Sequence, residues 1–457
     1  MKLTRRRFMG AASVAGAGIA CSASKLTDLL AAESSPSLLP GRFGKPALLG
    51  GNPVRTKPFP AWPVYDATEE NALTEVLRSG NWYRGYGKKV ERFESDFARL
   101  TGAAHCLATS SGTAALTAAL GALDIGPGDE VILPPFTFIA TYNVIVLNYA
   151  LPVFVDVDLS TFQIDANKIE AAITARTAAI LPVHLGGAPA DLDTILEVAA
   201  RHKMPVIEDA CQSHLAEWRG RKVGTWGAAG CFSFQASKNL NSGEGGAVLT
   251  NDDQFAEQCI SFQNQGRRRR DGGFRPSYSA SRGSNLRLTE FQAGLLMAQM
   301  TRLESQSRRR AENAKYLLKM LRKIPGIVPA EDYEGCTFNA YHLLMARYQP
   351  GPFAGLSRAK FLMALNKEGI PAGAGYAPMN KEAHVLALLK NPHYRRLYPP
   401  EILGSWEDRN RCPQNDVLCS EAFWFTQNML LGTRADMEQI VEAIQKIQSH
   451  AGDLAKG

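Results

Sequence analysis

The stretch Pro205-Val206-Ile207-Glu208-Asp209-Ala210-Cys211-Gln212 is an apolar run that ends abruptly in two carboxylates. Four further apolar runs of similar length, each bounded by turn residues, occur in the same part of the chain, at 131–133, 152–155, 179–183 and 230–234. Helical patterns alternate with them, at 112–123, 165–175 and 191–202. Strands that are apolar on both faces and alternate with helices belong to a parallel sheet that helices cover. The sequence therefore predicts an α/β fold with a mostly parallel central sheet.

Asp209 and Gln212 come just where this apolar run ends. Ligands of such sheets bind at the carboxyl ends of the strands, so both side chains are placed to point into a ligand crevice. Asp209 can form a charged hydrogen bond to a heterocyclic nitrogen and keep it protonated, and Gln212 can donate to a ring oxygen. The alternative is that Asp209 only caps the next helix.

The apolar run at 230–234 leads into Phe232-Ser233-Phe234-Gln235-Ala236-Ser237-Lys238-Asn239-Leu240, and the glycine-rich stretch 243–248 follows. This segment places one lysine, Lys238, in a loop of small residues at the end of a strand. A lysine that loses part of its hydration can act as an amine nucleophile, which Schiff-base chemistry requires. The setting of Lys238 thus differs from that of an ordinary surface lysine.

Ser110-Ser111-Gly112-Thr113 opens the helical pattern at 112–123. Free backbone N–H groups, the helix dipole and two hydroxyls can hold a phosphate dianion there, although an ordinary N-cap is the simpler interpretation of this segment alone. The sequence contains no P-loop and no GxGxxG, HExxH or GxSxG motif. The usual signals of nucleotide-binding proteins, zinc peptidases and serine hydrolases are therefore missing.

Taken together, these segments resemble the pyridoxal-phosphate-dependent aminotransferases of the DegT/DnrJ/EryC1/StrS type, which act on sugars and cyclitols. The resemblance runs from about Trp62 to about Ile447 and is densest at 134–141, 152–158, 182–187, 208–214 and in the lysine segment. It implies an aspartate-aminotransferase-like fold, fold type I of the pyridoxal phosphate enzymes, with a smaller C-terminal α/β domain. It also implies pyridoxal 5'-phosphate as the cofactor.

Residue by residue, the resemblance implies that Lys238 forms the Schiff base with the cofactor and then moves the proton between the substrate Cα and the cofactor C4′. Asp209 would pair with the pyridinium nitrogen, and Gln212 would contact the ring hydroxyl. The other predicted cofactor contacts are Gly112, Thr113 and Ser233 at the phosphate and Phe138 on the ring face. Asn285 matches the family position that reaches the phosphate of a neighbouring subunit, which implies a homodimer.

Several neighbours of these motifs are predicted with other roles. His184, His214 and His342 lie in motif segments and are expected to be hydrogen-bonded core histidines. Tyr341, beside His342, is a candidate for the substrate side. The loop 266–273 is unusually basic for the family; it would meet an anionic substrate or, more simply, lie in solvent.

The formal net charge of +7 is a weak argument for a nucleic-acid partner. Five basic residues against one acidic residue among the first 32 account for four of the seven charges. The remaining basic runs, 267–270 and 308–310, have no interleaved aromatic residues to stack on bases. They are expected to be solvated loop and helix faces, and neither a nucleic acid nor a metal is predicted as a partner.

The N-terminus resembles a twin-arginine export signal. Thr4-Arg5-Arg6-Arg7-Phe8-Met9-Gly10 precedes an apolar stretch of small residues, 11–20, which is too short to span a bilayer. Such signals serve proteins that fold before export. The sequence predicts a periplasmic protein attached to the membrane only through this signal, or a cytoplasmic one if the signal is not functional. Cys21 leaves lipidation open as an alternative.

The cysteines do not suggest a metal site or a disulfide framework. Besides Cys21 there are seven, scattered singly and in part inside apolar runs: Cys106, Cys211, Cys231, Cys259, Cys336, Cys412 and Cys419. We interpret them as small apolar residues. Four domains or segments are predicted: a signal at 1–32, a linker and arm at 33–60, a large cofactor-binding domain at 61–305 and a small C-terminal domain at 306–457.

Three functions are compatible with these features. The first transfers an amino group from glutamate or glutamine to a keto-sugar, possibly nucleotide-linked, or to a keto-cyclitol. The segment 283–292 is similar to members that act on inososes and aminohydroxybenzoate precursors, which favours a cyclic polyol ketone. The others are an exported, non-catalytic binding or regulatory protein and a pyridoxal-phosphate-dependent dehydratase or epimerase. A non-catalytic binding protein does not need a cofactor ring that accepts electrons beside a lysine that acts as a base. Related dehydratases replace this lysine by histidine. The presence of Lys238 therefore favours transamination over both alternatives.

Overall fold

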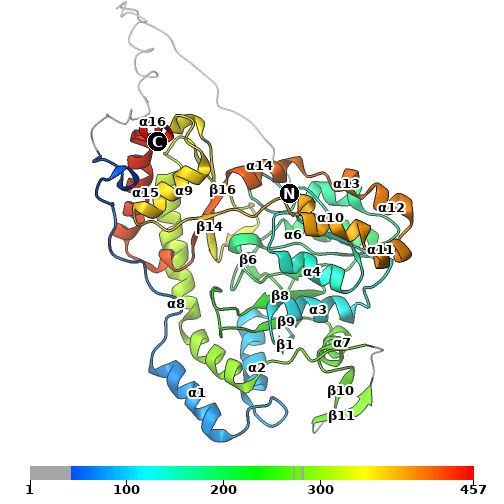
Figure 1. Ribbon diagram of the computed structural model, residues 1–457. Helices are drawn as coiled ribbons and strands as arrows, with labels where there is room; N and C mark the ends of the chain where they lie inside the picture. Colours follow the sequence, from blue (N-terminus) through cyan, green and yellow to red (C-terminus); the bar gives the residue numbers. More distant parts are fainter. Residues whose placement is uncertain (1–42, 271–272, 279–281, 457) are drawn as a thin grey trace, which may run out of the picture. The chain divides into compact units, whose positions relative to one another are not determined.

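The computed structural model describes residues 43–270, 273–278 and 282–456 (Figure 1). The predicted signal at 1–32 and the first part of the predicted linker lie outside these ranges. The described residues from Gly44 onward form one compact unit. Within the described ranges, no helix is both long and apolar enough to cross a membrane.

The central sheet has the predicted mostly parallel character. Its strands lie in the order β3 (Leu151–Phe154), β2 (Glu130–Leu133), β4 (Thr177–Ile180), β5 (Ile207–Asp209), β8 (Ala229–Ser233), β9 (Gly246–Thr250) and β1 (His105–Thr109). Parallel bridges from Ile180 to Val206 and from Val183 to Asp209 join β4 to β5. Only β9 runs against its two neighbours, β8 and β1.

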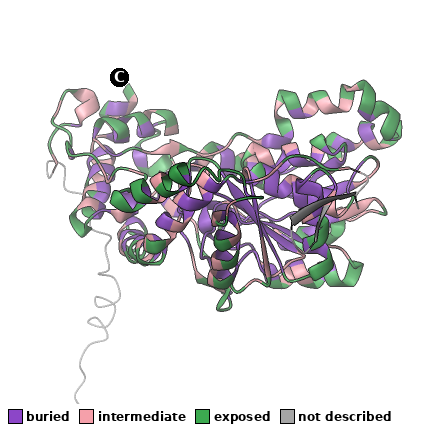
Figure 2. Ribbon diagram, turned by 90° about the horizontal axis from the view of Figure 1, so that it is seen from below, coloured by how far each residue is buried: buried purple, intermediate pink, exposed green. Residues whose placement is uncertain are grey.

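The strands read as continuous apolar runs because side chains are buried on both faces of the sheet (Figure 2). Val131 and Leu133 of β2 pack on one face with α3 (Gly112–Ala122), α4 (Ile139–Leu147) and α7 (Asp253–Gln263). Ile132, between them, faces the other side, where α5 (Ile169–Ala172) and α6 (Leu192–His202) pack. The alternation of β2 residues between two cores is what a sheet covered by helices requires.

The helix predicted at 165–175 is much shorter than expected. It consists of the 3₁₀ turn η2 (Ala166–Lys168) and the single turn of α5. Ile173 already has an extended backbone, because the chain must reach the start of β4 at Thr177. The need to begin a strand thus overrides the local helical pattern.

Two helices precede the central sheet in the chain, α1 (Ala67–Ser79) and α2 (Lys89–Thr101). Asp66 begins α1 with a capping box in which Glu69 takes part. Phe93 and Phe97 of α2 stack on each other, with ring centroids 5.6 Å apart. They meet Phe232 and Phe234 edge-on and so anchor α2 beside the strand that leads to Lys238.

The C-terminal part contains a second sheet with a core of its own. Its strands lie in the order β12 (Ile327–Pro329), β14 (Leu343–Tyr348), β16 (Ala422–Thr426) and β15 (Gly373–Ala374), and all pairings are antiparallel. The helices α8 (Glu290–Leu321), α9 (Arg358–Lys367), α15 (Arg434–Ser449) and α16 (Ala451–Lys456) pack around it. The boundary between residues 305 and 306 stays a prediction, and α8 runs through it.

A helical segment of the C-terminal part packs back on the central sheet. It comprises α10 (Ala383–Lys390), α11 (Pro392–Leu397), α12 (Pro400–Gly404) and α13 (Trp406–Arg409), and α14 (Pro413–Glu421) follows. The Trp406 indole N–H donates to the Pro152 carbonyl at 2.8 Å, and the Tyr394 hydroxyl donates to the Ala150 carbonyl at 3.0 Å. These bonds fix the segment to the edge strand β3.

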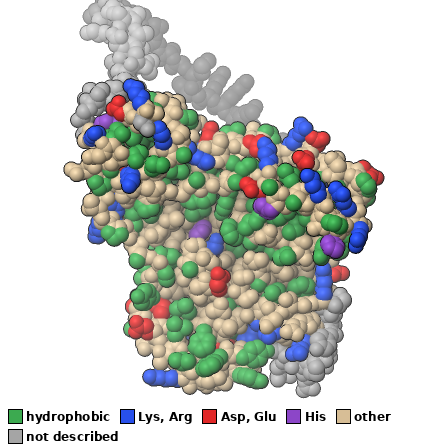
Figure 3. Space-filling model, in the orientation of Figure 1, with side chains coloured by type: hydrophobic (Ala, Val, Ile, Leu, Met, Phe, Trp, Pro, Cys, Tyr) green, Lys and Arg blue, Asp and Glu red, His purple; other side chains and the backbone are tan. Residues whose placement is uncertain are grey.

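Three short strands form a separate sheet, β13 (Cys336–Phe338), β6 (Glu217–Trp218) and β7 (Arg221–Lys222). The remaining 3₁₀ turns are η1 (Ala47–Leu49), η3 (Leu185–Gly187), η4 (Gly351–Phe353), η5 (Met379–Lys381) and η6 (Met429–Leu431). The basic loop predicted at 266–273 is partly a strand, since β10 (Arg267–Arg270) pairs with β11 (Gly273–Tyr278). On the described part of the face in Figure 3, basic and acidic side chains are interspersed.

Candidate active site

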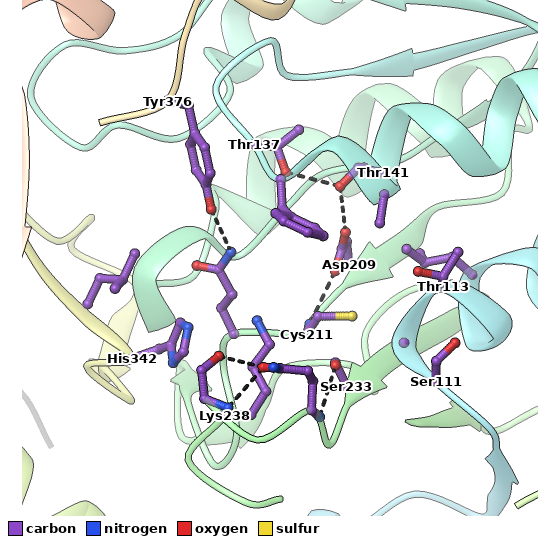
Figure 4. A pocket seen from close by; sticks show the side chains of 18 of the residues that line it. Ser111, Thr113, Thr137, Thr141, Asp209, Cys211, Ser233, Lys238, His342 and Tyr376 are labelled. Atoms are coloured by element: carbon purple, nitrogen blue, oxygen red, sulfur yellow. Dashed lines mark hydrogen bonds between the residues drawn. The ribbon is translucent and has the colours of Figure 1, made fainter. Parts of the chain in front are cut away.

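A cavity of about 580 Å³ lies at the carboxyl ends of the central strands (Figure 4). It is lined by the start of α3, the turn after β2, the residues after β5 and the loop after β8, and residues of the C-terminal part close it. The predicted residues that line it are Gly112, Thr113, Phe138, Asp209, Gln212, Ser233 and Lys238. The fold therefore brings seven of the eight predicted site residues together, although their roles stay predictions.

The start of α3 forms a tight concave cradle. The Ser111 hydroxyl oxygen accepts a hydrogen bond from the Ala114 backbone N–H at 3.0 Å, so the expected N-cap is present. A Cβ atom on Gly112 would lie 2.6 Å from Ser233 Cβ and 3.0 Å from Cys211 Sγ. Only glycine allows this approach, which leaves the first backbone N–H groups of α3 beside Ser233 and Thr113. Such a cradle suits a phosphate dianion.

Asp209 lies at the end of β5 and is buried, with 5 % of its surface exposed. Its Oδ2 accepts from the Thr141 hydroxyl at 2.8 Å, and its Oδ1 accepts from the Cys211 backbone N–H at 3.2 Å. The Thr141 hydroxyl also lies 3.0 Å from that of Thr137. Because no helix begins directly after Asp209, the helix-cap alternative is wrong. Asp209 instead lines the cavity, with its carboxylate held by these two donors.

Gln212 is held at both ends of its amide. Its Oε1 accepts from the Gly186 backbone N–H at 2.8 Å, and its Nε2 donates to the Tyr376 hydroxyl at 3.4 Å. Gly186 has φ +66°, and a Cβ there would lie 2.6 Å from Met345 Cε. These contacts fix which end of the Gln212 amide donates.

Lys238 enters the cavity from the loop after β8, on the side of Ser233 and His342 in Figure 4. The loop is closed by backbone bonds from Lys238 N–H to Gln235 O at 2.8 Å and from Ala236 N–H to Gly243 O at 2.9 Å. Burial lowers the pKa of the Lys238 amine, and nearby Cys211 and Asp209 oppose this shift. A larger fraction of neutral amine results, which is the nucleophilic form.

Phe138 and Asn285 differ in their relation to the cavity. Phe138 precedes α4, lines the cavity and has 57 % of its surface exposed, so its ring is free to cover a ligand. Asn285 is exposed and pairs through its backbone with Asn264. It is not among the residues that line the cavity of its own chain.

The three motif histidines have different surroundings. His184 is a hydrogen-bonded core residue as predicted: its Nδ1 accepts from Ala190 N–H at 3.1 Å, so its Nε2 donates to Glu208 at 2.9 Å. His342 lines the cavity. His214 is a core residue as well, buried with its ring against Phe232 and Phe234, and burial lowers its pKa to about 3.

Tyr341 does not line the cavity that holds Lys238. It lines a different cavity, of about 260 Å³, together with Arg322 and Asp332. Tyr341 has a left-handed backbone conformation, with φ +47°. The side chains of Tyr341 and His342 therefore point into different cavities, although the two residues are adjacent. The substrate-side role considered for Tyr341 is therefore not supported.

Sequence reasoning missed several lining residues. Thr137 precedes α4 and Thr141 lies in its first turn, and no local pattern shows that both side chains reach the cavity. Tyr376 and Trp424 come from distant parts of the chain and carry no local signal. Their rings contact each other, with centroids 5.1 Å apart, and form one wall.

All seven cysteines beyond Cys21 are unpaired, and Cys231, Cys259, Cys412 and Cys419 are buried. Within the described ranges, no group of three or more His, Cys, Asp or Glu side chains is arranged to hold a metal ion.

Comparison with known proteins agrees with this geometry. The sequence model of the DegT/DnrJ/EryC1/StrS aminotransferase family matches residues 63–396. An L-glutamine:2-deoxy-scyllo-inosose aminotransferase of Streptoalloteichus tenebrarius is 38% identical over 431 residues, which cover 89% of this chain and 98% of that protein.

Solved structures give the same result. The crystal structure of 3-amino-5-hydroxybenzoic acid synthase has a TM-score of 0.75 and 33% identity, covering 86% of this chain and 99% of that one. NtdA from Bacillus subtilis, with the cofactor PMP bound, has a TM-score of 0.71 and 27% identity, covering 84% of this chain and 81% of that one.

Proposed function

The chain belongs to the DegT/DnrJ/EryC1/StrS family and is a pyridoxal-phosphate-dependent aminotransferase with an aspartate-aminotransferase-like fold, and we propose that it moves an amino group from glutamine to a keto-cyclitol. The observation that carries the proposal is the single cavity in which Lys238, Asp209 and Gln212 lie beside the cradle of α3. A relative that covers most of this chain is named for glutamine and an inosose.

The residues present fit pyridoxal phosphate. The cradle that Gly112 leaves open beside Ser233 suits the phosphate, and the buried carboxylate of Asp209 suits a protonated ring nitrogen. Gln212, whose amide is fixed by Gly186 and Tyr376, would face the ring hydroxyl. When bound, the group supplies an electron sink for charge that develops at the substrate Cα.

The chain's own residues would then do three things. The Lys238 amine, with its lowered pKa, would move a proton from the Cα of the amino donor to the cofactor C4′ and, with the second substrate, from C4′ to the former carbonyl carbon of the ketone. Asp209 would hold a positive charge at the ring nitrogen throughout. Phe138 would cover one side of the cavity and reduce the access of water to the reacting atoms.

The remaining lining supports an uncharged polyol as the acceptor. It offers hydrogen-bonding groups and aromatic rings: Gln235, Ser237, Glu244, His342, Tyr376 and Trp424. Among the described residues that line the cavity, Lys238 is the sole lysine or arginine. A nucleotide diphosphate would call for further cations, so the lining favours a cyclitol over a nucleotide-linked sugar.

The test follows the amino group in two steps. Purified protein loaded with pyridoxal phosphate is expected to lose its Schiff-base absorbance on addition of L-glutamine. Addition of 2-deoxy-scyllo-inosose should restore it at least tenfold faster than a nucleotide-linked keto-sugar does. If only the nucleotide-linked sugar restores the Schiff-base absorbance, the acceptor is a nucleotide-linked keto-sugar and not a keto-cyclitol. Absence of any change with glutamine or glutamate would favour the non-catalytic alternative, and water loss without amino transfer would favour the dehydratase.

We further propose a homodimer in which Asn285 reaches the cofactor phosphate of the other subunit. Asn285 lies on the surface, outside its own cavity. Exposed aromatic side chains from a distant part of the sequence lie close to this segment, because Arg287, two residues after Asn285, stacks over the Tyr83 ring at 5.5 Å. Near Tyr83 in the chain, Tyr86 and Trp82 are 77 % and 51 % exposed. An exposed aromatic cluster of this kind suits a protein contact. A subunit that lacks Asn285 would then impair its partner's site.

We also propose that residues 1–32 direct export by the twin-arginine route. The support is the sequence Arg5-Arg6-Arg7-Phe8 before a short apolar stretch. Changing Arg5 and Arg6 to lysine is expected to trap the protein in the cytoplasm, because a receptor reads the arginines and lysine keeps only the charge. Cell fractionation compares this variant with the wild type. Export of both, or of neither, would contradict the proposal.

A further inference from the structure

The arginine run 308–310 is not a uniformly solvated helix face. Arg308 and Arg309 are exposed on α8, but Arg310 is fully buried. Its Nε donates to Gln427 Oε1 at 2.8 Å, while its two terminal nitrogens have no hydrogen-bond partner among the described residues. Burial lowers the pKa of Arg310 to about 9. Burying a guanidinium that has no carboxylate beside it lowers the stability of the fold unless other contacts compensate.

One side of Arg310 connects to the lysine loop. Its guanidinium carbon lies 5.0 Å from the centroid of the Trp62 ring, in a cation–π arrangement. The Trp62 indole N–H donates to the Ala236 carbonyl at 2.9 Å. Ala236 lies two residues before Lys238. Arg310 therefore holds, through Trp62, the part of the loop that leads into Lys238.

The other side of Arg310 connects to His342. Gln427, which accepts from Arg310, donates its backbone N–H to the His342 carbonyl at 3.1 Å. His342 Nδ1 lies 3.2 Å from Asn239 Oδ1, and Asn239 Nδ2 donates to the Ala340 carbonyl at 2.8 Å. Because Asn239 follows Lys238 directly, this path ends on the loop just after the lysine.

We propose that Arg310 is a positioning residue that fixes the residues on both sides of Lys238, through Trp62 before it and through Gln427, His342 and Asn239 after it. Arg310 does not line the cavity, so it acts only through these neighbours. Its rigid, planar guanidinium can stack on an indole and bond to an amide at once, which a lysine cannot do.

The same arrangement affects the protonation of His342 beside Lys238. Since Asn239 Nδ2 already donates to Ala340, its Oδ1 accepts, and His342 carries its hydrogen on Nδ1. Burial lowers the pKa of His342 well below its usual value, and Lys238, His214 and Arg310 lower it further. His342 thus presents a neutral ring to the cavity.

The first arm of the test is independent of activity. In Arg310→Met, amide hydrogen exchange in the peptide 235–242 is expected to be at least tenfold faster than in the wild type, because both supports of the loop are lost. Arg308→Met, at an exposed position of the same helix, is the matched control and should leave this peptide unchanged. Trp62→Phe keeps a ring but removes the N–H that reaches Ala236, and should accelerate exchange in this peptide as well.

The second arm rests on the proposed function. In the glutamine step, Arg310→Met should lower the rate constant at least tenfold while the half-saturating glutamine concentration changes less than threefold, and Arg310→Lys should recover only part of the rate. If Arg310→Met does not fold, Trp62→Phe and Arg310→Lys decide. Unchanged exchange at 235–242 in the folded variants, with only a lower melting temperature, would overturn the inference. If the wild type itself does not react with glutamine, the proposed function fails, and the exchange arm still decides on Arg310.

Discussion

Lys238→Ala is expected to abolish amino transfer while the protein still folds and still takes up pyridoxal phosphate without a covalent link. The methyl group of alanine cannot form a Schiff base, and the proton at the substrate Cα loses its base. The cradle at α3 and the carboxylate of Asp209 remain, so the cofactor keeps its other contacts. Loss of about 10⁴-fold or more in rate is expected, the upper end for general acid–base catalysis, because the covalent role is lost too.

The measurement is spectroscopic and chemical. The wild type should show Schiff-base absorbance that borohydride removes, with the reduced cofactor attached to the peptide that contains Lys238. Lys319→Ala, at an exposed lysine of α8, is the matched control and should behave as the wild type. Attachment of the reduced cofactor to any other lysine would disprove the assignment of Lys238.

The same variant tests the proposed dimer. Lys238→Ala and Asn285→Ala subunits are each expected to be impaired alone, and a mixed dimer carries one site with both defects and one intact site. Random exchange in an equal mixture should therefore restore about a quarter of the wild-type activity. No recovery, although the subunits demonstrably exchange, would exclude a role of Asn285 in the partner's site.

The central sheet could be predicted because its strands are buried on both faces, which leaves uninterrupted apolar runs in the sequence. Asp209 and Lys238 could be singled out for the same reason: each stands where such a run ends, and ligands bind at that edge. The helix start at Gly112 has a local signal too, since Ser111 is an N-cap residue. The strands, the two residues at their ends and the start of α3 could be predicted because each signal comes from residues adjacent in the sequence.

The contacts that orient the site could not be predicted in this way, because they join distant residues. Thr141 and Asp209 are 68 positions apart, and Gln212 and Tyr376 are 164 apart. The burial of Arg310 is likewise invisible locally, because the adjacent Arg308 and Arg309 are exposed and all three are arginines. Whether a side chain meets a partner across the fold depends on tertiary packing, which outweighs local preference.

Asp209→Asn is expected to leave the fold and cofactor uptake intact and to reduce turnover about 10²- to 10³-fold, the usual loss when a preorganised electrostatic partner is removed. Asparagine has nearly the same shape, and the Thr141 hydroxyl can still donate to its amide oxygen. A neutral amide, however, cannot keep the ring nitrogen protonated while negative charge develops at the substrate Cα. The loss should appear in the rate constant more than in the half-saturating glutamine concentration.

The hydrogen bonds around Asp209 predict a second, smaller effect at Thr141. A carboxylate has no hydrogen to donate, so the Thr141 hydroxyl donates to Asp209 Oδ2 and is left to accept from the Thr137 hydroxyl 3.0 Å away. Both threonines are buried, so water does not replace this donor easily.

Thr141→Val, which removes the hydroxyl at nearly constant shape, should lower the rate by a smaller factor than Asp209→Asn, and Thr141→Ser should restore it. Asp253→Asn, at an exposed carboxylate on α7, is the control and should leave turnover unchanged. Near-normal turnover of Asp209→Asn, measured with glutamine and the ketone, would mean that Asp209 serves the fold and not the reaction.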